Sequence, residues 1–336
     1  MENLSMQETE NKNNKESSSY KKALLKSGLP FEYEVCNYLR KSGFIVDFEY
    51  PYIKEDENGT QKEFSYDLDA SYSTIGHFLD FQIECKYKME PDTIWCFLPN
   101  ETAYMLDINT TSFIHEFDAF SEKKDLLCHT SDFPSLAPIC TKGVEIYSKD
   151  QANEKTIVQA AYQLSCSFTE KIIDDFYHEI NLLLSKDTIF YQIPIIVTNA
   201  NLYLLKTDIT TDEIKQSDNI ESIAQNHNIL LYTPHIDLIQ KNNNFQNLYS
   251  FLLNLPQKTI KDKFNTFTND IHHFSEVQSE LPRLIAIVHW DKEGKNLQEL
   301  IDYVKKYVWP TQEIKDMILE KAREKEVRIT KFRQKK

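Results

Sequence analysis

The stretch that decides the fold is Phe64–Lys88, with the sequence FSYDLDASYSTIGHFLDFQIECKYK. It contains two runs in which polar and apolar residues alternate. Because a strand has a side-chain period of two, each run predicts a β-strand with one polar and one apolar face. The polar positions are Asp67 and Asp69 in the first run, and Asp80, Gln82, Glu84, Lys86 and Lys88 in the second. If the two strands pair as neighbours, we expect Asp69, Glu84 and Lys86 to converge at one point.

Two carboxylates and a lysine at one point suit a site for a divalent metal and a phosphate. Mg²⁺ prefers a few carboxylates, several waters and the phosphate oxygens of the substrate, and Asp69 and Glu84 would supply the carboxylates. Lys86, on the same face as Glu84, would hold an attacking water or contact the scissile phosphate. Asp67 shares the strand face of Asp69 and replaces it if the register is shifted by one pair of residues. The alternative is an antiparallel hairpin with a solvated charged face, which is common.

The order of these residues resembles the PD-(D/E)xK, or restriction-endonuclease-like, superfamily of nucleases. Asp69 stands where the first acid of that pattern stands, and Glu84-Cys85-Lys86 stands for its (D/E)xK element. The upstream segment Leu29–Val46 resembles the first helix and first strand of that fold. The resemblance covers residues 28–98, and it departs from the pattern at Leu68, where the family has a proline before the acid.

The resemblance implies an α/β fold with a restriction-endonuclease-like core, in which helices flank a mixed central sheet. It implies a Mg²⁺-dependent endonuclease, with Mn²⁺ able to substitute, that hydrolyses phosphodiester bonds in nucleic acid, above all DNA, as in restriction or phage defence. Asp69, Glu84 and the backbone carbonyl of Cys85 would bind the metal, and Lys86 would position the water or the phosphate.

Glu32 is a further candidate site residue, on the predicted first helix. Phe31, Val35 and Leu39 form the apolar stripe of that helix, and Glu32 falls just beyond one edge of the stripe. A carboxylate directed toward the edge of a core needs a partner, because burial of an unpaired charge is costly. The resemblance implies that Glu32 borders the metal site, and the alternative is an ion pair with a surface Lys or Arg.

The rest of the chain predicts three parts. Residues 1–19 are polar and predict a disordered tail, residues 20–275 the nuclease domain with an insertion at 100–142, and residues 276–336 a strand and helices with a basic tail. Helical periodicity over Lys155–Leu183 predicts two pieces around Ser165–Ser167. Further strands are predicted at Thr93–Leu98, Thr188–Val197, Asn201–Leu205, Asn228–Tyr232 and Leu284–Trp290, and further helices at Leu297–Tyr307 and Gln312–Lys325.

Composition excludes several classes of protein. No apolar run approaches the roughly 18 residues that a membrane helix requires, so no membrane span is predicted. The six cysteines are scattered and include no CxxC pair, which is typical of a reducing cytosol and predicts a cytoplasmic location; Cys128-His129 with Cys140 lacks the spacing of a zinc site. With only six glycines the chain has no Gly-rich phosphate loop, so a P-loop or Rossmann nucleotide site is not predicted.

The net charge of −14 opposes the nuclease interpretation, because proteins that bind phosphate backbones usually present a positive surface. The segment Leu319–Lys336 has eight Lys and Arg against three Glu, and it could contact nucleic acid or be a solvated helix end. We therefore expect weak intrinsic affinity, aided by a second copy of the chain or a partner protein. Two other functions stay open: an inactive restriction-like fold that binds nucleic acid or protein as a scaffold, and a metal-dependent enzyme that acts on another phosphate.

Overall fold

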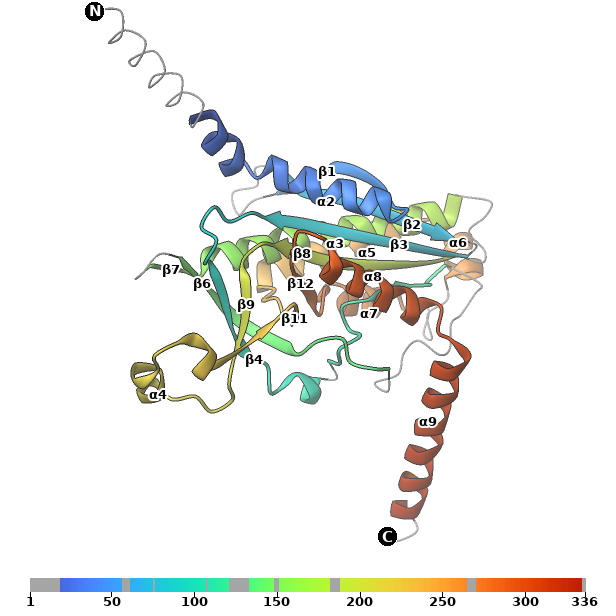
Figure 1. Ribbon diagram of the computed structural model, residues 1–336. Coiled ribbons are helices and arrows are strands. Elements are labelled where there is room, and N and C mark those ends of the chain that lie inside the picture. The colour runs from blue at the N-terminus through green and yellow to red at the C-terminus, as the bar shows by residue number, and fades with distance from the viewer. Residues whose placement is uncertain are drawn as a thin grey trace, which may run out of the picture.

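A mixed β-sheet of twelve strands runs through the described part of the chain, with helices on both of its faces (Figure 1). The described part, in a computed structural model, comprises residues 19–55, 61–74, 76–106, 108–120, 133–147, 151–181, 188–264 and 270–333. The predicted disordered tail lies outside these residues except for residue 19, which begins a short helix over 19–26. The prediction of an α/β protein with a mixed sheet flanked by helices is confirmed.

The N-terminal elements form one end of the sheet. They are α2 (Leu29–Lys41), β1 (Ile45–Glu55), β2 (Gln61–Thr74) and β3 (His77–Lys86). Strand β2 pairs antiparallel with β1 on one side and with β3 on the other, which confirms that the two alternating runs are neighbouring strands. Helix α2 begins after Gly28, whose φ of 81° is in the left-handed region that favours glycine.

The rest of the sheet is assembled from distant parts of the chain. Strand β3 pairs parallel with β8 (Ile189–Thr198), and β8 pairs parallel with β12 (Ile285–His289). The sheet then continues through β11 (Ile229–Tyr232), β6 (Ile139–Tyr147), β4 (Ile94–Pro99), β9 (Asn201–Leu205) and β10 (Ala224–His227), while β5 (His115–Phe117) pairs with β8 and β7 (Gln151–Asn153) with β6. The C-terminal strand therefore lies in the middle of the sheet, and the predicted insertion at 100–142 supplies β5 and the start of β6.

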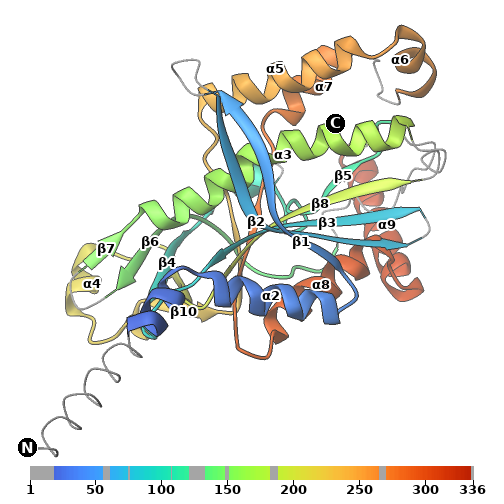
Figure 2. The same ribbon diagram turned by 90° about the horizontal axis from the view of Figure 1, so that it is seen from above.

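Helices α2 and α8 (Lys295–Val308) cover one face of the sheet, and α3 (Lys155–Asn181) covers the other (Figure 2). Helix α3 is continuous, so the prediction of two pieces was wrong. The hydroxyls of Ser165 and Ser167 donate to the backbone carbonyls of Ala161 and Leu164, so these polar residues are satisfied within the helix. The other helical segments are η1 (Ala103–Leu106), α4 (Thr211–Gln216), η3 (Ile220–Ser222), α5 (Leu238–Asn254), α6 (Gln257–Lys263), α7 (Ile271–Gln278) and α9 (Gln312–Arg333).

The hydrophobic core has a layer on each face of the sheet. Strand β8 shows this well, since Ile195 and Val197 pack in the layer under α2 and α8, whereas Ile196 packs in the layer under α3. Every residue of β8 is buried, which is the pattern of a central strand covered on both faces. Polar side chains on β2 and β3 that face α3 therefore lie under a helix and need partners there.

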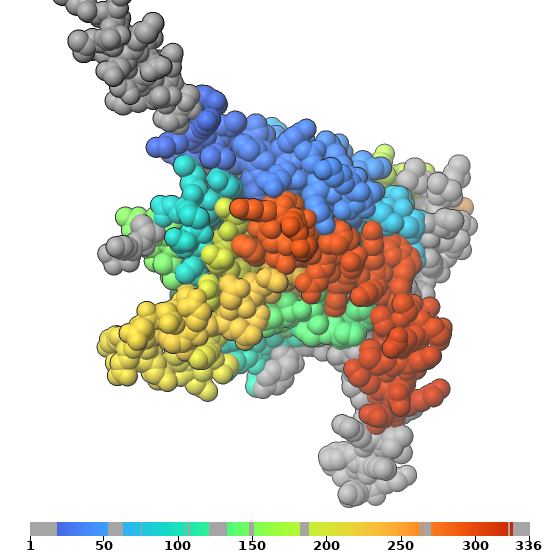
Figure 3. All heavy atoms as spheres, viewed as in Figure 1, coloured from blue at the N-terminus to red at the C-terminus, as the bar shows by residue number. Residues whose placement is uncertain are grey.

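Helix α9 begins against the body of the protein and then leaves it (Figures 1 and 3). Ile314, Met317 and Ile318 pack on the core layer of α8, whereas Leu319 and Glu320 are exposed. Among the described helices, including this long one, none has the length and apolar character needed to cross a membrane.

Candidate active site

The register of β2 and β3 brings Asp67, Glu84 and Lys86 together. Leu68 pairs with Ile83, and the next step of the same register sets Asp67 across from Glu84. Asp67 Oδ2 accepts a hydrogen bond from the backbone N–H of Cys85 at 2.6 Å. Lys86 Nζ forms an ion pair with Glu84 Oε1. Glu84 is completely buried, and its second oxygen, Oε2, has no hydrogen-bond partner within the described ranges.

Asp69, the predicted first carboxylate, is not brought to this group. It lies across from Gln82, and its Oδ2 accepts from Lys171 Nζ of α3 at 2.8 Å. Its Oδ1 accepts from the hydroxyl of Tyr66 at 2.8 Å. Both oxygens of Asp69 are therefore occupied in a second polar cluster under α3. The position expected for Asp69 is taken by Asp67, the alternative that the strand pattern left open.

Glu32 lies in the same electrostatic cluster as Asp67 and Lys86. Burial raises the pKa of Glu32, the charges of Asp67 and Glu49 add to this effect and Lys86 opposes it, and together they bring the pKa to about 7. A side chain at Gly28 would come within 3.1 Å of Glu32 Oε1, so the glycine that begins α2 also leaves room for this carboxylate. Glu32 therefore interacts electrostatically with Asp67 and Lys86, and among the described residues it forms no ion pair with a Lys or Arg side chain.

Glu49 is a member of the cluster that sequence analysis missed. Its φ of 58° is in the left-handed region, which is uncommon for a residue other than glycine. It falls in a gap in the pairing of β1 with β2, between the pairs Phe48 with Leu68 and Tyr50 with Tyr66, and so lies across from Asp67. Its charge raises the pKa values of Glu32 and Asp67. No periodic signal in β1 distinguishes Glu49 from an ordinary exposed acid.

The carboxylates of the cluster are held in an environment that disfavours their charge. Burial raises the pKa of Glu84, the charge of Asp67 adds to this effect and Lys86 opposes it, and together they bring the pKa to about 8. Burial also raises the pKa of Asp67. For Lys86, burial acts to lower the pKa, but the carboxylates of Glu84 and Asp67 outweigh it and the pKa is raised, so the lysine stays charged. The charge of Lys86 does not balance the several acids around it, and a bound divalent cation would compensate for their negative charge.

The donor set fits a cation that keeps water and phosphate ligands. No three His, Cys, Asp or Glu side chains in the described ranges are arranged to hold a metal by themselves. Mg²⁺ does not need such a cage, because it is usually bound by one or two carboxylates together with waters and phosphate oxygens. Asp67 and Glu84 supply two carboxylates, and the unpartnered Glu84 Oε2 supplies a free acceptor. Cys85 is buried, and burial raises the pKa of its thiol, so the group that it could offer to a cation is its backbone carbonyl.

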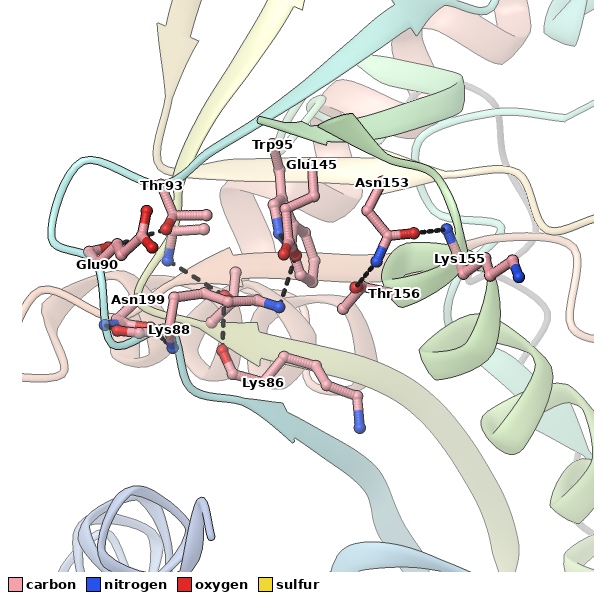
Figure 4. A network of polar contacts seen from close by, with 12 residues as sticks. Lys86, Lys88, Glu90, Thr93, Trp95, Glu145, Asn153, Lys155, Thr156 and Asn199 are labelled. Atoms are coloured by element: carbon pink, nitrogen blue, oxygen red, sulfur yellow. Dashed lines mark hydrogen bonds and ion pairs between the residues drawn. The ribbon is translucent and has the colours of Figure 1, made fainter. Parts of the chain in front are cut away.

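The chain just after Lys86 is anchored by a separate polar network (Figure 4). Lys88 Nζ lies 2.5 Å from Glu145 Oε2, which also accepts from the indole N–H of Trp95 at 2.9 Å. Asn199 Oδ1 accepts from the backbone N–H of Lys88, and Asn199 Nδ2 donates to its carbonyl. The side chain of Lys86 points away from Glu145. Lys88 therefore anchors the chain after β3, whereas Lys86 forms its ion pair with Glu84 of the carboxylate cluster.

The other residues that the sequence singled out lie elsewhere. Cys140 is buried in β6, whereas Cys128 and His129 are outside the described residues. Comparison with protein-family models, with curated proteins and with solved structures found no match to this chain.

Proposed function

We propose that this protein is a divalent-metal-dependent nuclease with a restriction-endonuclease-like core. The observation that carries the proposal is the group formed by Asp67, Glu84 and Lys86 on two adjacent strands, with an unpartnered, fully buried carboxylate oxygen on Glu84. Glu32 on the first helix supports it, because it joins the same cluster from another element. The strand acid, the Glu-x-Lys pair and the helix glutamate are the residue types that the resemblance implies, with Asp67 in place of Asp69.

Each residue has a chemical task in this proposal. A bound Mg²⁺ would activate water, orient the phosphate and neutralise developing charge. Asp67 and Glu84 hold the cation, and the N–H of Cys85 orients the Asp67 carboxylate. Lys86, charged and tethered to Glu84, positions the attacking water or the scissile phosphate. Glu32, with a pKa of about 7, can take up a proton at neutral pH.

A cleavage assay tests the proposal. Purified protein is incubated with single- and double-stranded DNA and with RNA, in Mg²⁺, in Mn²⁺ and in EDTA. We expect cleavage that depends on the metal, and we expect Lys86→Ala to lower turnover by about 10²-fold or more while metal binding is retained. Lys155→Ala, at the exposed start of α3, is the matched control and should cleave like the parent. Equal activity of Lys86→Ala and the parent would show that the site is placed wrongly.

The second candidate function is a binding scaffold with an inactive site. The net charge of −14 favours it, because a strongly acidic protein gains little affinity from phosphate contacts. If no DNA or RNA is cut with either metal, also when a partner protein is supplied, this function replaces the nuclease.

A further inference from the structure

Two exposed aromatic side chains, next in the chain to Glu32 and Glu49, are stacked on each other. Tyr33 of α2 is 55% exposed and Phe48 of β1 is 38% exposed. Their ring centroids are 6.5 Å apart and their planes differ by 11°. Tyr33 directly follows Glu32 in the chain, and Phe48 directly precedes Glu49, so each ring is adjacent in sequence to an acid of the cluster. The charges of Glu32 and Glu49 interact, so the two backbone segments that carry the rings meet at the site.

An arginine side chain lies beside one ring of this pair. The guanidinium of Arg40 lies 5.7 Å from the centroid of Phe48. Arg40 Nη2 donates to the backbone carbonyl of Val46 at 2.8 Å, which fixes the guanidinium beside the ring. An exposed aromatic surface with an adjacent arginine suits a ligand that has both a flat π face and a phosphate.

We propose that Tyr33 and Phe48 form a stacking platform for the bases of single-stranded nucleic acid, which directs that strand past the candidate active site. This inference rests on the proposed function for the identity of the site, and it names the substrate class. Within a duplex the base faces are covered by neighbouring bases, so an aromatic platform can engage only bases that are unstacked. Every base has a π face, so the platform binds single strands with little sequence preference.

The charge of the whole molecule favours a single strand over a duplex. A duplex presents a dense array of phosphates that is bound largely through positive charge. This protein has a net charge of −14, so its overall charge opposes binding of that array. Stacking does not depend on net charge, and it therefore supplies a larger share of the affinity here than in a basic protein.

Binding without cleavage tests the platform. Fluorescence anisotropy in EDTA would measure the affinity for labelled single-stranded DNA and RNA of about 16 nucleotides, and for the duplex of the same sequence. We expect Tyr33→Leu and Phe48→Leu each to weaken single-strand binding by about 5- to 100-fold, with little change for the duplex. Phe48→Trp, which keeps a π face, should retain the parent affinity. Tyr177→Leu is the matched control, because Tyr177 is 60% exposed on α3 and is not part of the stacked pair.

The results separate this proposal from the nuclease proposal. Unchanged single-strand affinity in both leucine variants, or equal binding of single strand and duplex by the parent, would overturn the platform even if the protein cleaves. Loss of single-strand affinity in both variants supports the platform even if no cleavage is found with any metal. Thermal unfolding followed by circular dichroism confirms that the variants are folded, which we expect for exposed substitutions.

Discussion

Asp67 and Asp69 are two residues apart on β2, yet their side chains meet different charges. Asp67 accepts from the N–H of Cys85 and interacts with the charge of Lys86. Asp69 accepts from Lys171 and Tyr66, so its charge is paired with Lys171 in a separate cluster under α3. The assignment of the metal carboxylate therefore depends on which partner each aspartate has, rather than on its spacing from Glu84.

The two aspartates can be distinguished by matched substitutions. We expect Asp67→Asn to weaken metal binding and to lower turnover by about 10²-fold or more, because it removes a negative ligand from the cluster. We expect Asp69→Asn to keep turnover and to lower the free energy of unfolding by about 1–3 kcal/mol, because Lys171 loses a charged acceptor. Metal titration by calorimetry, cleavage assays and urea unfolding measure these effects. The reverse result would restore Asp69 as the ligand.

At the scale of elements, α3 covers a buried ionic cluster on β2, β3 and β8. Lys171 of α3 pairs with Asp69, and its pKa is raised by the nearby carboxylates against the effect of burial. Burial raises the pKa values of Asp80 and Asp175, which interact with the same lysine. Hydrogen bonds complete the cluster: Ser71 with Asp80, Gln192 with Asp175 and Gln82 with Gln192. The cluster ties α3 to three strands and holds Asp69 away from the site.

Removal of the lysine should destabilise the fold strongly. Lys171→Met leaves Asp69, Asp80 and Asp175 without their shared cation, and loss of one partner of a buried ion pair typically costs about 3–5 kcal/mol. Urea unfolding measures the change in the free energy of unfolding. Lys215→Met, at an exposed position on α4, is the control and should change stability by no more than about 0.5 kcal/mol. A small effect of Lys171→Met would mean that the acids are neutral in the folded protein.

Glu179, near the end of α3, makes stability depend on pH. Burial raises its pKa from 4.5 to about 9, so between these values the folded protein binds a proton that the unfolded chain has released. The contribution of Glu179 to stability is therefore complete below about pH 4.5 and is lost as the pH rises toward 9. As the pH rises across this range, we expect the free energy of unfolding of Glu179→Gln to increase relative to that of the parent by about 1.4 kcal/mol per pH unit. Urea unfolding at several pH values measures this difference. Parallel pH dependence of the two proteins would contradict this, and Glu320→Gln on α9 is an exposed control.

At the scale of the whole molecule, charge is distributed unevenly. The chain has a net charge of −14, yet Leu319–Lys336 carries a surplus of five positive charges. Helix α9 carries most of this segment away from the body (Figure 1). A segment with a surplus of positive charge on an acidic protein is a candidate for contact with a phosphate backbone.

Truncation after Ile318 tests the role of the basic segment in binding. Among the described side chains of α9, Ile318 is the last that packs on the core, so we expect the shortened protein to keep its fold. We expect weaker binding of single-stranded nucleic acid, and a salt dependence of log K that falls by about 0.7 for each phosphate contact that is lost. Anisotropy titrations at several salt concentrations measure both. An unchanged slope would show that the segment is a solvated helix end.

Much of the local structure could be predicted from the sequence. The alternation in β2 and β3 is a local property, and it predicts both strands and their polar faces without knowledge of their partners. The break predicted in α3 was wrong because Ser165 and Ser167 can satisfy their hydroxyls on the preceding turn, which polarity alone does not indicate. Glu49 was missed because its role depends on an irregular backbone conformation.

The sequence by itself determined that Glu84 and Lys86 share a strand face, because two residues on one strand are related by a fixed period. It also determined that an aspartate of the neighbouring strand would lie near them, since a short turn joins the two strands. Only the tertiary structure decided which partners the two aspartates have, because Lys171, about a hundred residues away in the chain, pairs with Asp69, whereas Asp67 accepts from the N–H of Cys85. It also decided that β8 and β12 complete the sheet beside β3. Parallel neighbours are joined by long connections, so their contacts depend on the packing of the whole chain.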